Sequence, residues 1–68
     1  MKTLNWMAAA SRRTLILAKP GAGTVTITPG RGGGWTVQTA NRVVTVDAVR
    51  LEEQMEAWDF RGYREVPS

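Results

Sequence analysis

Two short segments in the middle of the chain alternate between apolar and polar residues, a third alternates in part, and this pattern most constrains the fold. They are TVTIT at 24–28, WTVQT at 35–39 and RVVTV at 42–46. Because successive side chains of a β-strand point to opposite faces, each segment predicts a strand with one buried and one exposed face. Pro29, the glycine-rich residues 30–34 and Asn41 predict turns between them. The pattern is typical of an antiparallel meander.

A fourth strand and a first helix are expected before this meander. Residues 14–18 (TLILA) are apolar and partly β-branched, and turn-forming residues follow at 19–23. They predict a buried strand, although the same residues could instead continue the first helix. The alanine-rich residues 3–13 predict a short N-terminal helix, whose apolar face we expect to carry Leu4, Met7 and Ala8.

A second helix should follow the meander. Asp47 can cap it, because its carboxylate can accept hydrogen bonds from the free N–H groups of the first turn. Gly62 is the expected end of the helix, and residues 63–68 are expected to form a flexible tail. Apolar residues at helical spacing form one stripe, and acidic residues form the neighbouring outward stripe. The apolar stripe is Ala48, Leu51, Met55 and Trp58, and the acidic one is Glu52, Glu56 and Asp59.

The expected fold is therefore a single small α+β domain over residues 1–68. It has a short N-terminal helix, a three- to four-stranded antiparallel meander and a C-terminal amphipathic helix packed on the sheet. A chain of 68 residues buries only about 60% of the surface that it exposes when unfolded. Binding to a partner or to a second copy would add to this limited stability, so we expect a partner and consider a homodimer.

The residue types that are missing exclude much chemistry. The chain has no cysteine and no histidine, which removes disulfides, thiolate nucleophiles and the commonest zinc ligands. Ser11 and Ser68 have no histidine to activate them, so we expect no enzymatic activity and no cofactor. Carboxylates in a row on one helix usually form a solvated face, and we expect no metal. No apolar run approaches the roughly 20 residues of a membrane span, and we expect a soluble cytoplasmic protein.

Charge is distributed unevenly along the chain. Residues 1–46 hold six basic and no acidic residues, whereas residues 47–68 hold six acidic residues and three arginines. The asymmetry either marks a face that binds a polyanion or reflects internal complementarity between a basic sheet and an acidic helix. In a meander, one end of the sheet would collect several arginines that could contact a phosphate backbone. These are Arg12, Arg13, Arg31 and Arg50, and they support one hypothesis, a small basic DNA- or RNA-binding regulator.

The last helix predicts a different binding surface. Val49 and Phe60 project away from its apolar stripe, amid acidic residues, and apolar side chains with a charged rim are typical of protein interfaces. The candidate partner-binding residues are Val49, Glu52, Glu53, Glu56 and Phe60. In the alternative interpretation, Val49 packs against the sheet edge and Phe60 lies beyond the helix end. Among the functional hypotheses we prefer a non-enzymatic module that binds protein stoichiometrically, through either the acidic helix or the arginine-rich end of the sheet.

The kind of chain suggests a biological setting by analogy only. Very short, cysteine-free chains of mixed charge are typical of phage and plasmid accessory proteins, including inhibitors of host defence complexes, so a host protein complex is the expected partner. The helix, hairpin and helix outline resembles small phage head-joining proteins in general arrangement, although the extra strands depart from it. A third hypothesis is a small structural subunit of a phage-like assembly that assembles through its edge strands.

Overall fold

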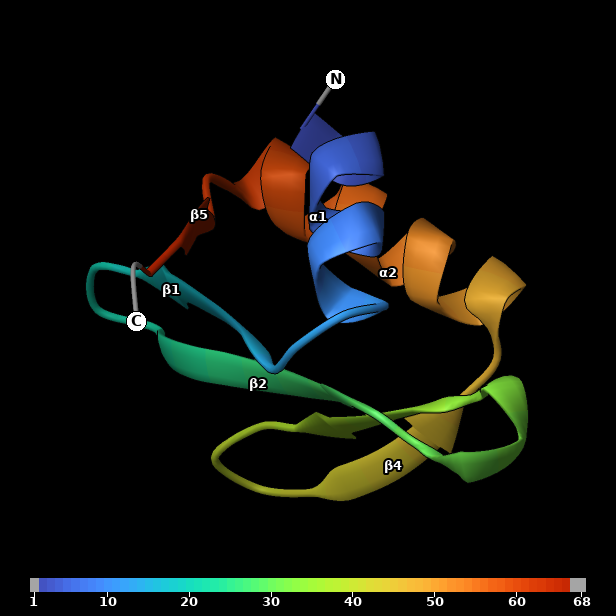
Figure 1. Cartoon of the computed structure of the whole chain (residues 1–68). Coiled ribbons are helices and arrows are strands. Elements are labelled where there is room, and N and C mark those ends of the chain that lie inside the picture. Colours follow the sequence, from blue (N-terminus) through green and yellow to red (C-terminus); the bar gives the residue numbers. More distant parts are fainter. Residues whose placement is uncertain (1, 67–68) are drawn as a thin grey trace.

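The chain folds into one five-stranded antiparallel sheet with two helices on one of its faces (Figure 1). The structure is a computed structural model that describes residues 2–66, and the side chains of residues 4–66. Its elements are, in chain order, α1 (Lys2–Ala10), β1 (Leu15–Lys19), β2 (Gly23–Pro29), a 3-10 turn η1 (Arg31–Gly33), β3 (Trp35–Gln38), β4 (Val43–Val46), α2 (Ala48–Arg61) and β5 (Arg64–Glu65). The expected α+β fold is confirmed.

The sheet has the order β4-β3-β2-β1-β5, so its first four strands form the expected meander. Residues 14–18 contribute to a strand and do not continue the first helix. The register places Leu15, Ile27 and Val37 side by side across three strands, and all three are buried against the helices. The opposite face carries mostly threonines and is covered by no described element. Alternation along the strands of the meander thus separates the core from an open face that is rich in threonine.

The apolar face of α1 differs from the expected one. Leu4 is 61% exposed, Ala8 is exposed, and only Met7 is partly buried. The side that faces the core instead carries Trp6, Ala9 and Ala10. These three also share a helical face, and they bury the large indole beside two small residues that let the helix approach the sheet.

The C-terminus of α1 is fixed to the sheet by a tryptophan. Trp35 Nε1 donates a hydrogen bond of 3.0 Å to the carbonyl oxygen of Ala10, and Ala10 is fully buried. The last carbonyls of a helix have no partner within the helix, so this bond satisfies a group that would otherwise be buried unpaired. Trp35 thereby connects the start of β3 to the end of α1.

Helix α2 begins and ends as the sequence indicates. The Asp47 side chain accepts a hydrogen bond from the Arg50 amide at 2.8 Å, and Gly62 has the left-handed φ of 96° that favours glycine. Leu51 and Met55 are fully buried, and Trp58 packs against the core partly buried. The expected stripe is wrong at one position, because Ala48 is exposed and contact with the core begins one turn later.

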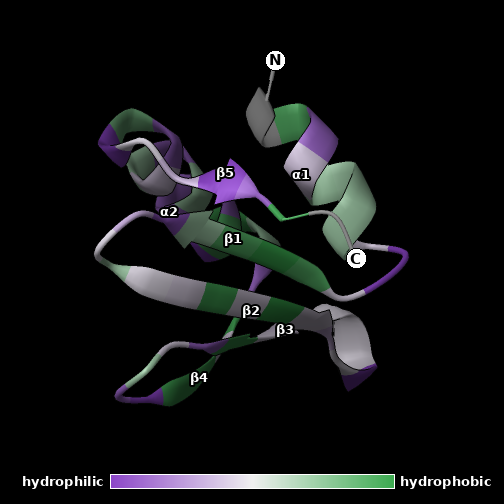
Figure 2. Cartoon of the chain, turned by 90° about the vertical axis from the view of Figure 1, so that its left-hand side faces the viewer, coloured by the Kyte–Doolittle hydropathy of each residue, from purple (hydrophilic) through white to green (hydrophobic). Residues whose placement is uncertain are grey.

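The end of the chain is corrected from a flexible tail to a strand for residues 64–65. They pair with β1, with Leu17 opposite Glu65, and the Val66 amide donates to the Ile16 carbonyl at 2.8 Å. Strand β5 is hydrophilic, in contrast to the apolar β1 beside it (Figure 2). It covers the backbone edge of β1 that would otherwise be exposed. Residues 67 and 68 of the expected tail lie outside the described residues.

Candidate functional site

The outward side of α2 exposes two large apolar side chains. Phe60 is 93% exposed and Val49 is 67% exposed. They are eleven positions apart, which corresponds to about three helical turns, so they point in nearly the same direction. Leu51 and Met55 lie on the opposite side and are fully buried. Val49 therefore does not pack against the sheet, and Phe60 lies within the helix and not beyond its end.

Acidic side chains lie between these two apolar residues. Glu52, Glu53 and Glu56 are all exposed, and within residues 4–66 no hydrogen bond or ion pair engages their carboxylates. We call Val49, Glu52, Glu53, Glu56 and Phe60 the outer face of α2. Asp59, expected in the same acidic stripe, is partly buried and already has an interaction partner. The outer face thus combines two apolar side chains with three carboxylates that form no hydrogen bond or ion pair with the described residues.

One end of the sheet was expected to collect four arginines, and we call it the arginine end. The strand order there agrees with the expected meander. The register places the start of β1, the loop before β3 and the end of β4 at the same end of the sheet. Lys19, the last residue of β1, and Arg42, in the turn before β4, lie at the other end. The four candidate arginines, Arg12, Arg13, Arg31 and Arg50, are all exposed.

Two of the expected anion-binding groups at this end are already engaged. Arg13 Nη2 lies 2.7 Å from Glu65 Oε2 in an ion pair, and Asp47 occupies the N-terminus of α2 by accepting from the Arg50 amide. The ion pair compensates one of the four arginine charges, and Asp47 places a carboxylate where a phosphate would have to bind. Sequence reasoning missed the ion pair because Glu65 was assigned to a tail.

The glycine loop before β3 has a structural role in its own right. The Gly30 amide donates to the Gly34 carbonyl at 2.8 Å and closes the loop. Gly32 and Gly33 adopt φ angles of 74° and 84°, which side chains disfavour. The turn itself thus explains the glycines of the loop, and only Arg31 remains as a candidate contact for a polyanion.

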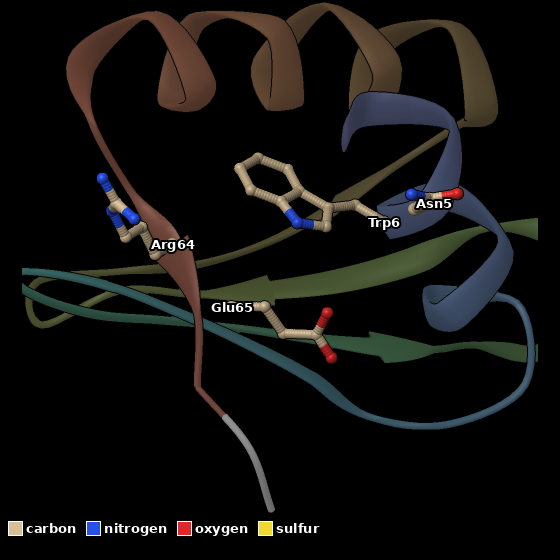
Figure 3. A pocket seen from close by; sticks show the side chains of 4 residues that line it. All are labelled: Asn5, Trp6, Arg64 and Glu65. Carbon is tan, nitrogen blue, oxygen red and sulfur yellow. The ribbon is translucent and has the colours of Figure 1, made fainter. Parts of the chain in front are cut away.

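A hollow of about 360 Å³ lies between α1 and β5 (Figure 3). It is lined by Asn5, Trp6, Arg64 and Glu65. Trp6 is only 4% exposed and belongs to the core, and Glu65 is paired with Arg13. Glu65, the acidic residue of this hollow, is therefore held in an ion pair. The four lining residues do not include an acid and a base arranged for catalysis.

The described part of the chain offers little to other functional classes. Among residues 2–66, no three histidine, cysteine, aspartate or glutamate side chains are grouped so that they could hold a metal ion. None of the helices in that range is both long and apolar enough to cross a membrane. Comparison with protein-family models, curated proteins and solved structures found no match to this chain.

Proposed function

We propose that this chain is a non-enzymatic protein-binding module and that the outer face of α2 is its binding surface. The observation that carries the proposal is Phe60, a large aromatic side chain that is 93% exposed at the C-terminal end of an acidic helix face. Aromatic side chains are enriched among the residues that contribute most to protein interfaces. Phe60 contributes almost no burial to the fold, so its presence is better explained by an interaction.

The outer face also specifies the chemistry of its partner. Val49 and Phe60 are about 16 Å apart along the helix axis, and each could fill a small apolar pocket in a groove that receives one side of a helix. The carboxylates of Glu52, Glu53 and Glu56, which form no ion pair with the described residues, favour a groove whose rim carries lysine or arginine. Charge complementarity of this kind mainly raises the association rate and selects the partner. The proposed partner is therefore a protein with an apolar, positively rimmed groove.

An inhibitor of a host defence complex, of the kind that phages and plasmids encode, fits this proposal. Such a protein acts in the cytoplasm by stoichiometric binding, and it needs one good binding face and no catalytic group. Binding to nucleic acid through the arginine end is less well supported, because Glu65 engages Arg13 and Asp47 caps α2. The two functions differ in their response to salt and nuclease.

The test is recovery of partners from a nuclease-treated lysate by the tagged chain, followed by affinity measurement with the purified partner. Phe60→Ala should weaken binding at least tenfold, since a buried aromatic anchor of an interface contributes about 2 kcal/mol or more. Leu4→Ala is the matched control, because Leu4 is also exposed, at 61%, but lies on α1. It should leave the affinity unchanged.

Two results would overturn the proposal. One is that Phe60→Ala and Leu4→Ala bind the partner equally well. The other is that every partner is lost after nuclease treatment, and that affinity for nucleic acid falls steeply with salt and with charge reversal at Arg12. This second result would establish the polyanion-binding alternative.

A further inference from the structure

The two edges of the sheet differ in their protection. One edge is β5, which has only two residues, Arg64 and Glu65, both charged. The other edge is β4, which has four residues, Val43–Val46, without charge or proline. Natural proteins usually protect edge strands by shortness, charge or proline, because an unprotected edge pairs with other strands. Only β5 has such protection, and the contrast in hydropathy is visible in Figure 2.

The hydrogen-bonding groups that β4 presents outward can be assigned from its hairpin. The Thr39 amide donates to the Arg42 carbonyl at 2.9 Å, so the backbone groups of Arg42 point toward β3. Backbone groups of successive strand residues point alternately to the two sides. The groups of Val44 therefore also point toward β3, while those of Val43 and Thr45 point away from the sheet. These outward groups lie on the open edge beside the Val43 side chain, which is 62% exposed.

We infer that β4 pairs with β4 of a second copy of this chain in an antiparallel homodimer. In the register that uses the outward groups, Val43 of one copy faces Thr45 of the other, and a twofold axis passes beside Val44. Each facing pair exchanges its N–H and C=O groups, so the contact is self-complementary, as a twofold interface requires. The two sheets then join into one continuous sheet.

Charge favours a second copy over a foreign strand. Arg42 precedes β4 and Asp47 follows it, and both are exposed. Antiparallel pairing of two identical strands brings Arg42 of one copy beside the end of the partner strand, next to Asp47, and the same happens at the other end. Asp47 Oδ1 is used by the Arg50 amide, so the second carboxylate oxygen is the one that would meet Arg42. In a parallel arrangement Arg42 would lie beside Arg42 and Asp47 beside Asp47, and these like charges would repel each other.

This inference uses no residue of the outer face of α2, so it stands or falls independently of the proposed function. The first test is molecular mass in solution, measured by sedimentation equilibrium from micromolar to millimolar concentration. The mass should reach twice the 7.5 kDa of one chain. The double variant Val43→Lys/Thr45→Lys should remain monomeric, because it places lysines opposite each other. Thr24→Lys/Thr28→Lys is the control, since both threonines are exposed on the same face of β2.

The register has its own test, because the chain lacks cysteine. The two Val44 residues would face each other with Cα atoms about 4.5 Å apart, within the range of a disulfide. Val44→Cys should therefore form a covalent dimer under mild oxidation. Val43→Cys should not, because its diagonal separation of about 7–8 Å is too large. A monomeric mass at every concentration would overturn the homodimer, and equal crosslinking of the two cysteine variants would overturn the register.

Discussion

The two sides of α2 both carry large apolar side chains but place them in opposite environments. Leu51 and Met55 are fully buried against the sheet, whereas Val49 and Phe60 are 67% and 93% exposed. One apolar stripe is enough to pack a helix on a sheet. The inner side is therefore explained by folding, and the outer side is not.

The same comparison holds for charge. The residues of α2 that face the sheet, Leu51, Met55 and Trp58, are all uncharged. The outer side instead places three exposed glutamates between its two apolar residues. A helix that only needed solubility would be served by glutamate alone, without an aromatic residue beside it. The difference teaches that stability and binding can be tested separately on one helix, by substitutions on its two sides.

Leu51→Ala is expected to have the largest effect on stability, because it disrupts the packing of the inner side of α2 against the sheet. Leu51 has no exposed surface, and truncation of a buried leucine costs about 2–5 kcal/mol through lost burial and a residual cavity. The melting temperature of a domain this small falls about 4–8 °C for each kcal/mol. We expect the melting temperature to fall by about 8 °C or more for a loss of roughly 2 kcal/mol, measured by circular dichroism.

Val49→Ala is the matched control for that substitution, two positions away on the outer side. It should change the free energy of unfolding by no more than about 0.5 kcal/mol, as is usual for surface substitutions. Equal destabilisation by the two alanines would show that the two sides of α2 do not differ in their contribution to the fold.

Asp47→Ala is expected to have an intermediate effect, because it removes the cap that both sides of the helix share. The Asp47 carboxylate accepts from the Arg50 amide at 2.8 Å, and loss of such a cap costs about 1 kcal/mol. Asp47→Asn keeps the accepting oxygen and removes the charge, so it should retain most of the stability in urea unfolding. If asparagine and alanine were equally destabilising, the charge and not the hydrogen bond would be responsible.

Local patterns predict the parts of this fold that depend on residues close in sequence. Alternation at residues 24–28, 35–39 and 42–46 indicates the strands, and Asp47 and Gly62 indicate the ends of α2. The same helical periodicity places Val49 and Phe60 opposite the core, so the outer face of α2 is also visible in the sequence. What binds there is not encoded in any local pattern.

The features that sequence reasoning missed depend on distant contacts. Residues 64–65 form a strand because β1 offers them an open edge, and no pattern within two residues can indicate that. The Arg13 and Glu65 ion pair follows from this strand and joins positions that are 52 residues apart. The prediction of which face of α1 is buried was wrong, because that helix has two apolar faces. The sheet against which α1 packs determines that Trp6 is buried.

Phe60→Ala has the smallest expected effect on stability, and this is what makes it informative. The same change in a core would cost about 3–5 kcal/mol, but the Phe60 side chain is 93% exposed and loses almost no contact with the fold. Alanine also has the higher helix propensity, so the free energy of unfolding in urea should be unchanged or slightly higher. A loss of more than about 1 kcal/mol, well beyond the usual range for surface positions, would mean that Phe60 packs in solution. In that case the proposed binding surface would lose its main support. Unchanged stability would allow any loss of partner binding by this variant to be assigned to the interface itself.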